Sequence, residues 1–351
     1  MIAARAASVA LLLLVSACSS PERSMTQDID RMMAAYAGDG PGAAVLVLKD
    51  GQPLVRKGYG RADLERAVPV TPATNFRLAS VTKQFTAAAI LLLVEDGKLT
   101  LDDRVRTWLP SLPTEADGVT IRHLLTHTSG LIDYEDVIPA SMTEQLHDAD
   151  VLTLLEGEAR LYFAPGAAYR YSNSGYALLA LIVGKASGHS FAQFLQQRIF
   201  APLGMANTVA YEHGISEIAH RAFGYSANAQ GWQRTDQSQT SAVLGDGGVY
   251  SSLDDLAKWD AALYDERLLT RASLDAAFTP ATPTDDPTVD YGFGWRVTGE
   301  TVWHSGETIG FRNVIVRWPR QRMTVVVLTN RNEPEPYRLA LEIQKLLASG
   351  G

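Results

Sequence analysis

The 351-residue sequence has little cysteine and no concentration of positive charge. Its one cysteine, Cys18, excludes an internal disulfide and a cysteine-based zinc site. The 39 acidic residues outnumber the 31 basic ones, and no basic cluster occurs, so binding to the phosphate backbone of nucleic acids is disfavoured. With 46% hydrophobic and 20% charged residues, the composition is that of a globular protein of about two domains.

Several motifs of enzymes and cofactor-binding proteins are also absent. The sequence has no G-x-S-x-G, no G-x-G-x-x-G and no phosphate-binding Gly-Lys-Ser/Thr loop, which disfavours an α/β-hydrolase nucleophile and a nucleotide cofactor. His123 and His127 lie four apart on a predicted helix, but no acidic partner follows in the zincin pattern. We therefore predict neither a metal nor an organic cofactor.

Long hydrophobic runs are missing as well, because the apolar stretch from Ala6 to Val15 is too short to span a bilayer. It follows Arg5 and precedes small residues, as in a signal peptide covering residues 1–17. With Cys18 next, the segment resembles a bacterial lipoprotein signal, which implies lipidation of Cys18, a polar tether over residues 18–25 and a place on the periplasmic side of a membrane. Ordinary cleavage after Ala17, giving a soluble periplasmic or secreted protein, remains the alternative.

Strand patterns occur at both ends of the remaining sequence and helical patterns in the middle. The predicted strands are 43–48, 54–59, 291–298, 302–304, 311–318 and 323–329, with a hairpin turn at Asp50-Gly51. The predicted helices are 26–38, 81–95, 121–127, 175–186, 190–200, 253–264 and 337–348, and residues 227–240 are expected to form a surface loop. This order predicts an α+β fold in which the two ends complete one antiparallel sheet.

Three short motifs bear chemistry. Ser80 and Lys83 are three apart at the start of a helix, so the lysine amine can lie beside the serine hydroxyl and accept its proton. Tyr171 and Asn173 precede another helix, where a phenol near a lysine is a plausible general base and an amide can orient a substrate carbonyl. Taken singly, each pair is more typical of a helix cap or of packing.

The third motif is His304-Ser305-Gly306 on a predicted edge strand. Glycine allows a ligand to approach the backbone closely, and the N–H that follows it can complete an oxyanion hole. In isolation, a strand-end turn with a surface histidine explains the same residues.

The order of the three motifs resembles that of the serine β-lactamase-related hydrolases, in the branch of class C β-lactamases and D-alanyl-D-alanine carboxypeptidases. The supporting segments are LASVTK at 78–83, VTIRHLLTHTSGL at 119–131, PLGM at 202–205, GGVYSS at 247–252 and HSG at 304–306. The resemblance covers residues 26–348 and implies an antiparallel sheet flanked by helices (about 26–80 and 288–348), an all-helical domain (about 81–287) and an active site between them.

The resemblance also implies roles. Ser80 would be the acylated nucleophile, and Lys83 and Tyr171 the base pair. Asn173 would contact the substrate amide, and His304 occupies the place of the lysine in the Lys-Thr-Gly motif of β-lactamases. The backbone N–H groups of Ser80 and of the residue after Gly306 would form the oxyanion hole.

One position departs from the family pattern. A small hydroxyl residue is common where this chain has Glu307, and a glutamate facing the cleft would repel a substrate carboxylate. Arg296 could neutralise this glutamate or bind the carboxylate itself, and Tyr134 either lines the cleft or packs. Penicillins and acyl-D-Ala-D-Ala are then expected to be poor substrates, and neutral esters or amides bearing an amine better ones.

The sequence therefore predicts a serine hydrolase that cleaves ester or amide bonds through an acyl-enzyme, as an esterase, a D-amino-acid peptidase or a weak β-lactamase. Its partners would be a small-molecule or peptide substrate and, through a lipid anchor, a membrane, but not nucleic acid. The competing hypothesis is a non-catalytic, penicillin-binding-like lipoprotein that serves as a binding module.

Overall fold

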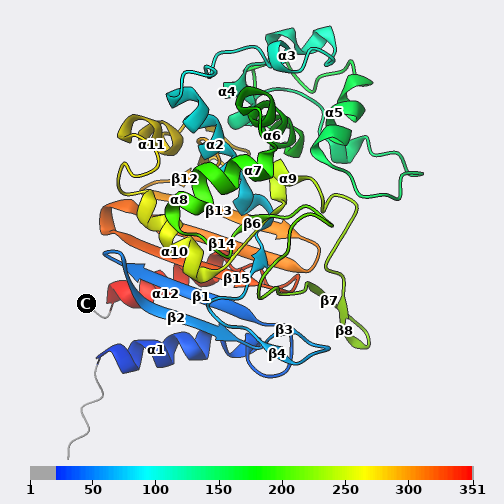
Figure 1. Cartoon of the computed structure of the whole chain (residues 1–351). Coiled ribbons are helices and arrows are strands. Elements are labelled where there is room, and N and C mark those ends of the chain that lie inside the picture. The colour runs from blue at the N-terminus through cyan, green and yellow to red at the C-terminus, as the bar shows by residue number, and fades with distance from the viewer. Residues whose placement is uncertain (1–20, 350–351) are drawn as a thin grey trace, which may run out of the picture.

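A computed structural model describes residues 21–349, which form one large antiparallel sheet and a group of helices above it (Figure 1). The signal peptide and Cys18 lie outside the described residues. The α-helices are α1 (Pro21–Met32), α2 (Lys83–Glu95), α3 (Val105–Trp108), α4 (Ile121–Leu125), α5 (Asp148–Glu156), α6 (Asn173–Ser187), α7 (Phe191–Leu195), α8 (Ala201–Leu203), α9 (Leu244–Gly247), α10 (Leu253–Ala262), α11 (Arg271–Phe278) and α12 (Tyr337–Ser349). Shorter helical turns are η1 (Ala34–Tyr36), η2 (Ala79–Thr82), η3 (Thr114–Gly118), η4 (Tyr134–Asp136), η5 (Gln196–Phe200) and η6 (Pro319–Gln321).

The strands belong to one eight-stranded sheet and three small ones. The large sheet has the order β10 (Thr282–Pro283), β11 (Asp290–Tyr291), β12 (Arg296–Thr298), β13 (Thr301–Thr308), β14 (Phe311–Trp318), β15 (Met323–Thr329), β1 (Ala43–Lys49) and β2 (Gln52–Tyr59). The small sheets are β3 (Arg61–Asp63) with β4 (Val68–Pro69), β5 (Phe76–Arg77) with β9 (Val249–Ser251) and β6 (Val209–Ala210), and β7 (Tyr225–Asn228) with β8 (Gly231–Arg234). The pairing of β1 with β15 joins the two ends of the chain, as the sequence predicts.

Alternation along the central strands gives the large sheet two buried faces. Val45 and Val327 pack with α1 and α12 on one face, whereas Leu46 and Val326 belong to the core on the other. α10 lies against β1 and β15 on this second face (Figure 1). α10 falls within the predicted helical part of the chain, and it contacts the sheet through β1 and β15, where Asp260 accepts a hydrogen bond from Thr324 of β15.

The helical part is built around α6, which contacts α2, α4, α5, α7 and α9. Because neighbours surround it, α6 is apolar on nearly every side, with Leu178, Leu179 and Ile182 all fully buried. Within residues 21–349 no single helix has the length and apolarity of a membrane span. α6 and residues 191–203 pass that test together, but with a bend of 74° between them, and by length and composition only.

Several predicted elements are confirmed, and others differ for local reasons. β14 and β15 have the predicted limits, and the Asp50-Gly51 turn has positive φ at both residues, as a two-residue hairpin turn requires. The strand predicted for 291–298 is broken, because Gly294 adopts a φ of 77° and its Cα approaches α2 so closely that a Cβ would lie 2.6 Å from the Lys83 carbonyl oxygen. The predicted loop at 227–240 contains most of the β7–β8 hairpin, and α1 begins at Pro21, inside the expected tether.

Candidate active site

Ser80 and Lys83 meet where η2 leads into α2. Ala79, just before the serine, has a φ of 50°, a strained conformation for a residue with a Cβ. The Lys83 side chain is fully buried, and its Nζ donates hydrogen bonds to Ser80 Oγ (3.0 Å), Asn173 Oδ1 (2.8 Å) and the Asp246 carbonyl oxygen (3.0 Å). An ammonium has three N–H donors, so each is paired in this geometry. The structure thus brings the predicted serine, lysine and asparagine into direct contact.

Asn173 is held by a segment forty residues earlier in the chain. It is the first residue of α6, and the Asp133 carboxylate accepts hydrogen bonds from the backbone N–H groups of Asn173 (2.6 Å) and Ser174 (3.4 Å), in place of a local cap. The Asn173 amide nitrogen donates to Glu135 Oε1 (3.1 Å) while its oxygen faces Lys83. Because an amide nitrogen has two N–H groups, a substrate carbonyl can accept from the second while the first remains bonded to Glu135.

β13 forms the opposite wall of the site. Its first residues pair with β12, but residues 304–308 have only β14 beside them, and their other edge faces η2. A Cβ on Gly306 would lie 2.0 Å from the Leu78 carbonyl oxygen, so only glycine permits this approach. The close packing of β13 on η2 brings Glu307 into the hollow that contains Ser80.

His304 is buried in a cluster of aromatic rings. Its Nδ1 lies 2.6 Å from the Ser305 carbonyl oxygen, so this nitrogen carries the proton, and its Nε2 accepts a hydrogen bond from the Tyr291 hydroxyl (2.9 Å). Burial, reinforced by the Arg296 charge, lowers the pKa of His304 well below its usual value, so the ring is neutral at pH 7. Both nitrogens are therefore occupied, and a direct contact to substrate would require one of these bonds to break.

The aromatic ring of Tyr171 lies beside the Lys83 ammonium. The Lys83 Nζ is 4.9 Å from the Tyr171 ring centroid, and that ring packs on His127 with centroids 4.3 Å apart. The Tyr171 hydroxyl is buried and has no hydrogen-bond partner among residues 21–349. His127 Nδ1 accepts from the Ser172 N–H (3.1 Å), and burial lowers the pKa of His127 well below its usual value. The role of Tyr171 as a base stays a prediction.

Acidic side chains line the site. A shallow hollow of about 40 Å³ around Ser80 is bordered by Glu135, Asp246 and Glu307, and also by Tyr134. The Tyr134 hydroxyl donates to Asp246 Oδ2 (3.0 Å), and burial raises the pKa of Asp246 to about 7. Burial, together with the neighbouring Asp133, also raises the pKa of Glu135. Of the two roles considered for Tyr134, the structure shows both, because its fully buried ring borders the hollow.

The partner of Glu307 is not Arg296. Glu307 Oε1 forms an ion pair with Arg312 Nη2 at 2.5 Å, and these residues are directly opposite each other on β13 and β14. The Arg296 guanidinium instead lies 5.5 Å from the Tyr171 ring centroid, and its buried Nε has no hydrogen-bond partner within residues 21–349. Of the two roles considered for Arg296, an ion pair with Glu307 is therefore wrong, since cross-strand register selects Arg312, and binding of a substrate carboxylate stays a prediction.

The sequence analysis missed four charged residues of the site: Asp133, Glu135, Asp246 and Arg312. Arg312 had a readable signal, because the hairpin between β13 and β14 fixes its position opposite Glu307. The three acids gave no signal in the sequence, because they reach the site from segments that are distant along the chain.

The two histidines considered as a metal pair, His123 and His127, do not lie on the same helix. α4 ends at Leu125, so His127, with a φ of 58°, is not on the helix that contains His123. His123 Nδ1 instead accepts a hydrogen bond from the Thr120 N–H at 3.3 Å, at the start of α4. The described part of the chain contains no group of three metal-ligating side chains.

Comparisons with known proteins agree with this geometry. A family profile described as Beta-lactamase matches residues 25–349. The chain is 37% identical to penicillin-binding protein 4* of Bacillus subtilis, over 85% of this chain and 70% of that protein. It is 34% identical to a D-aminopeptidase of Gluconobacter oxydans, over 83% of this chain and 56% of that protein. The solved structure of an octameric penicillin-binding protein homologue from Pyrococcus abyssi matches with a TM-score of 0.83 and 28% identity, over 93% of this chain and 77% of that one.

These matches confirm two predictions made from the sequence. The fold is that of β-lactamases and penicillin-binding proteins, and the protein is a serine hydrolase of the acyl-enzyme type. The chain belongs to the beta-lactamase family.

Proposed function

We propose that Ser80 is the nucleophile and that Lys83, with Tyr171, takes the proton of its hydroxyl. The observation that carries this proposal is the 3.0 Å contact between the buried Lys83 Nζ and the Oγ of Ser80, a residue that lines the hollow. Lys83 donates three hydrogen bonds in the resting geometry, so it must lose a proton before it can act as a base toward Ser80. The adjacent Tyr171 ring makes its phenol the second candidate for that step.

The proposed reaction has two stages. In the first, Ser80 Oγ attacks the substrate carbonyl carbon, and the leaving alcohol or amine receives the proton from the base. In the second, a water molecule hydrolyses the ester on Ser80, so that the acyl group passes to water. The backbone N–H groups of Ser80 and Glu307 are the proposed donors to the developing oxyanion. The close packing of β13 on η2 at Gly306 supports this role.

For the substrate, we propose neutral esters, or amides with a nearby amine. Glu135, Asp246 and Glu307 line the hollow, and Arg77, the one arginine among its lining residues, has its guanidinium bonded to Ser241. A substrate carboxylate would meet like charge, whereas an ammonium would meet opposite charge. The similarity to a D-aminopeptidase is consistent with an amine-bearing substrate. Arg312 offsets part of the Glu307 charge, and the raised pKa of Asp246, about 7, makes the negative charge of the hollow grow as pH rises above neutrality.

A fluorophosphonate probe tests catalysis against the competing binding-module function. The expected result is one adduct on folded wild-type protein, at Ser80, and none on Ser80→Ala. A folded protein that does not react would favour the binding module. A panel of p-nitrophenyl esters, nitrocefin and D-amino-acid amides, read beside Ser80→Ala, then tests the substrate class, and fast turnover of nitrocefin would contradict the proposed preference.

We also propose that the protein is exported and attached to a membrane through lipid on Cys18. The support is the sequence alone, in which a ten-residue apolar stretch and small residues precede that cysteine. The anchor is placed outside the domain matched by the family profile, which begins at residue 25.

A further inference from the structure

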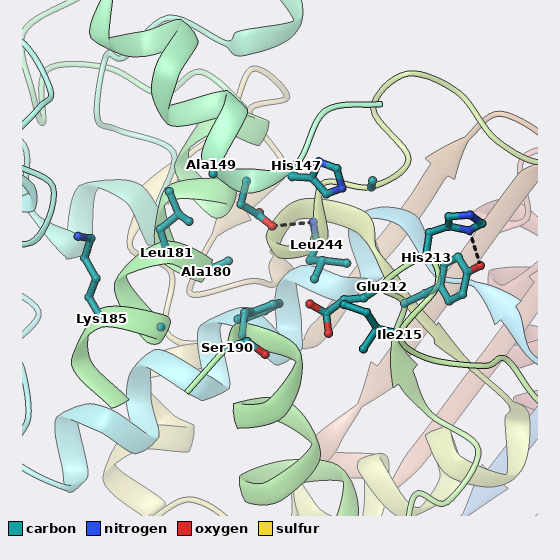
Figure 2. Close-up of a pocket in the computed structure, with 15 residues that line it drawn as sticks. His147, Ala149, Ala180, Leu181, Lys185, Ser190, Glu212, His213, Ile215 and Leu244 are labelled. Carbon is teal, nitrogen blue, oxygen red and sulfur yellow. Dashed lines mark hydrogen bonds between the residues drawn. The ribbon is translucent and has the colours of Figure 1, made fainter. Parts of the chain in front are cut away.

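A second and larger cavity lies away from Ser80, between helices of the upper part of the molecule. Its volume is about 430 Å³, which is within the usual range for small-molecule sites. It is bordered by the start of α5, one side of α6, the start of α7, the loop at residues 211–215, Ala242 and the start of α9 (Figure 2).

The wall of this cavity is largely apolar. Leu181 of α6, Phe191 of α7 and Leu244 of α9 contribute large side chains, with Ala180 beside them. Ile215 borders the opening and is 79% exposed, a high value for a residue of this size. Such a concave apolar surface favours a ligand with an apolar body.

One carboxylate in this wall has no cation to neutralise it. In Figure 2 the Glu212 carboxylate is turned toward the space between Leu244 and Ser190. Glu212 is half-buried, and its side chain has no ion pair or hydrogen bond among residues 21–349. A free carboxylate against an apolar wall is a recognition feature for a cation.

The other charged groups of the cavity leave its interior acidic. Asp148 is buried in the wall, where it accepts hydrogen bonds from the Leu244 and Gly245 N–H groups (both 3.0 Å). His147 pairs with Asp150, outside the cavity, and His213 is bonded to the Tyr211 hydroxyl. Lys185 is exposed, and Figure 2 shows its ammonium turned away from the other labelled residues.

We propose that this cavity is a binding site for an apolar primary amine, whose ammonium pairs with Glu212 and whose chain or ring packs on Leu181, Phe191 and Leu244. The site is separate from the catalytic hollow, although α9 forms part of the wall of both, with Leu244 in one and Asp246 in the other. The inference does not depend on the proposed catalytic roles.

The test is isothermal titration calorimetry on the full chain carrying Ser80→Ala, with 3-phenylpropylamine as the probe. The neutral 3-phenylpropan-1-ol and the anionic 4-phenylbutanoate serve as matched ligands. We expect the amine to bind at least about tenfold more tightly than either, and Glu212→Gln to remove that advantage. Leu181→Trp places a larger side chain in the cavity beside its apolar wall and should abolish binding of the amine.

Two acidic controls locate the binding. Glu217→Gln changes an exposed acid outside the cavity, and Glu135→Gln changes an acid of the catalytic hollow, so each should leave the dissociation constant of the amine within about twofold. The proposal is overturned if the carboxylate binds as tightly as the amine. It is also overturned if Glu212→Gln and Leu181→Trp both leave amine binding intact, or if Glu135→Gln abolishes it.

Discussion

The catalytic hollow around Ser80 and the distal cavity, which is the larger cavity bordered by Glu212, differ in size and in polarity. The hollow around Ser80 has a volume of about 40 Å³, and the buried Lys83 beside it donates three hydrogen bonds, one from each N–H of its ammonium. The distal cavity is about ten times larger, with an apolar wall and an unpaired carboxylate, Glu212. The hydrogen-bonded polar groups of the catalytic hollow therefore suit it to catalysis, whereas the larger, apolar distal cavity is better suited to binding a ligand. Each region also has a lysine, Lys83 in one and Lys185 in the other, which allows a direct contrast.

The largest expected effect separates these two lysines. Lys83→Ala should lower kcat/KM for a p-nitrophenyl ester by at least about 100-fold, and Tyr171→Phe by a similar factor, because both remove a candidate base. Lys185→Ala should leave kcat/KM within about twofold. A near wild-type rate for Lys83→Ala on every substrate would show that the assigned base pair is wrong.

The next effect concerns stability and its dependence on pH. Burial raises the pKa of Asp246 from its reference value of 3.8 to about 7. Between about pH 4 and 7 the native carboxyl keeps a proton that the unfolded chain has lost, so the free energy of unfolding falls as pH rises through this window. A shift of about three pH units corresponds to about 4 kcal/mol. Asp246→Asn removes this decline, because asparagine does not ionise.

Urea unfolding at pH 4 and pH 8 measures this effect. Asp246→Asn should gain up to about 4 kcal/mol over wild type at pH 8 and little at pH 4. If the variant and the wild type differ equally at both pH values, Asp246 does not titrate in this window. At pH 8, where the native carboxyl is ionised, the same variant should also lower kcat/KM, because it removes a negative charge that interacts with Lys83.

A smaller effect distinguishes the acids of the two regions. Glu307→Ser should raise acylation by benzylpenicillin about fivefold more than it changes hydrolysis of a neutral ester, since one like charge near a carboxylate costs about 1 kcal/mol in water. Glu212→Gln, the matched change in the distal cavity, should alter neither rate. Equal effects of Glu307→Ser on the two substrates would mean that this side chain does not face the substrate carboxylate.

The smallest expected effect on catalysis comes from the amino terminus. Cys18→Ser should release the protein from membranes and leave kcat/KM unchanged, because Cys18 precedes the catalytic domain. Fractionation of cells that express the variant measures the first part, and retention in the membrane fraction would contradict the lipid anchor.

Local patterns predicted much of the fold and the centre of the site. Runs of apolar residues predict β1, β14 and β15 closely, with the two-residue turn at the end of β1, and helical spacing brings Ser80 and Lys83 together. The break between β11 and β12 was missed, because it depends on packing against α2.

The charges around the site were harder to predict. Asp133 caps α6 from forty residues away, and Asp246 reaches Tyr134 across 112 residues, so no local pattern contains either contact. Arg312 was missed because the predicted strand ended at His304, four residues before β13 ends, which hid the cross-strand pair with Glu307.

The central claim is that Ser80 becomes acylated during turnover. The most direct measurement is rapid-quench mass spectrometry of the full chain mixed with p-nitrophenyl butyrate. The account predicts a burst of p-nitrophenol and, on the same timescale, a mass increase of one butyryl group on the peptide that contains Ser80, with both absent in Ser80→Ala. Turnover of the ester with no adduct, or with the adduct on another residue, would contradict the account.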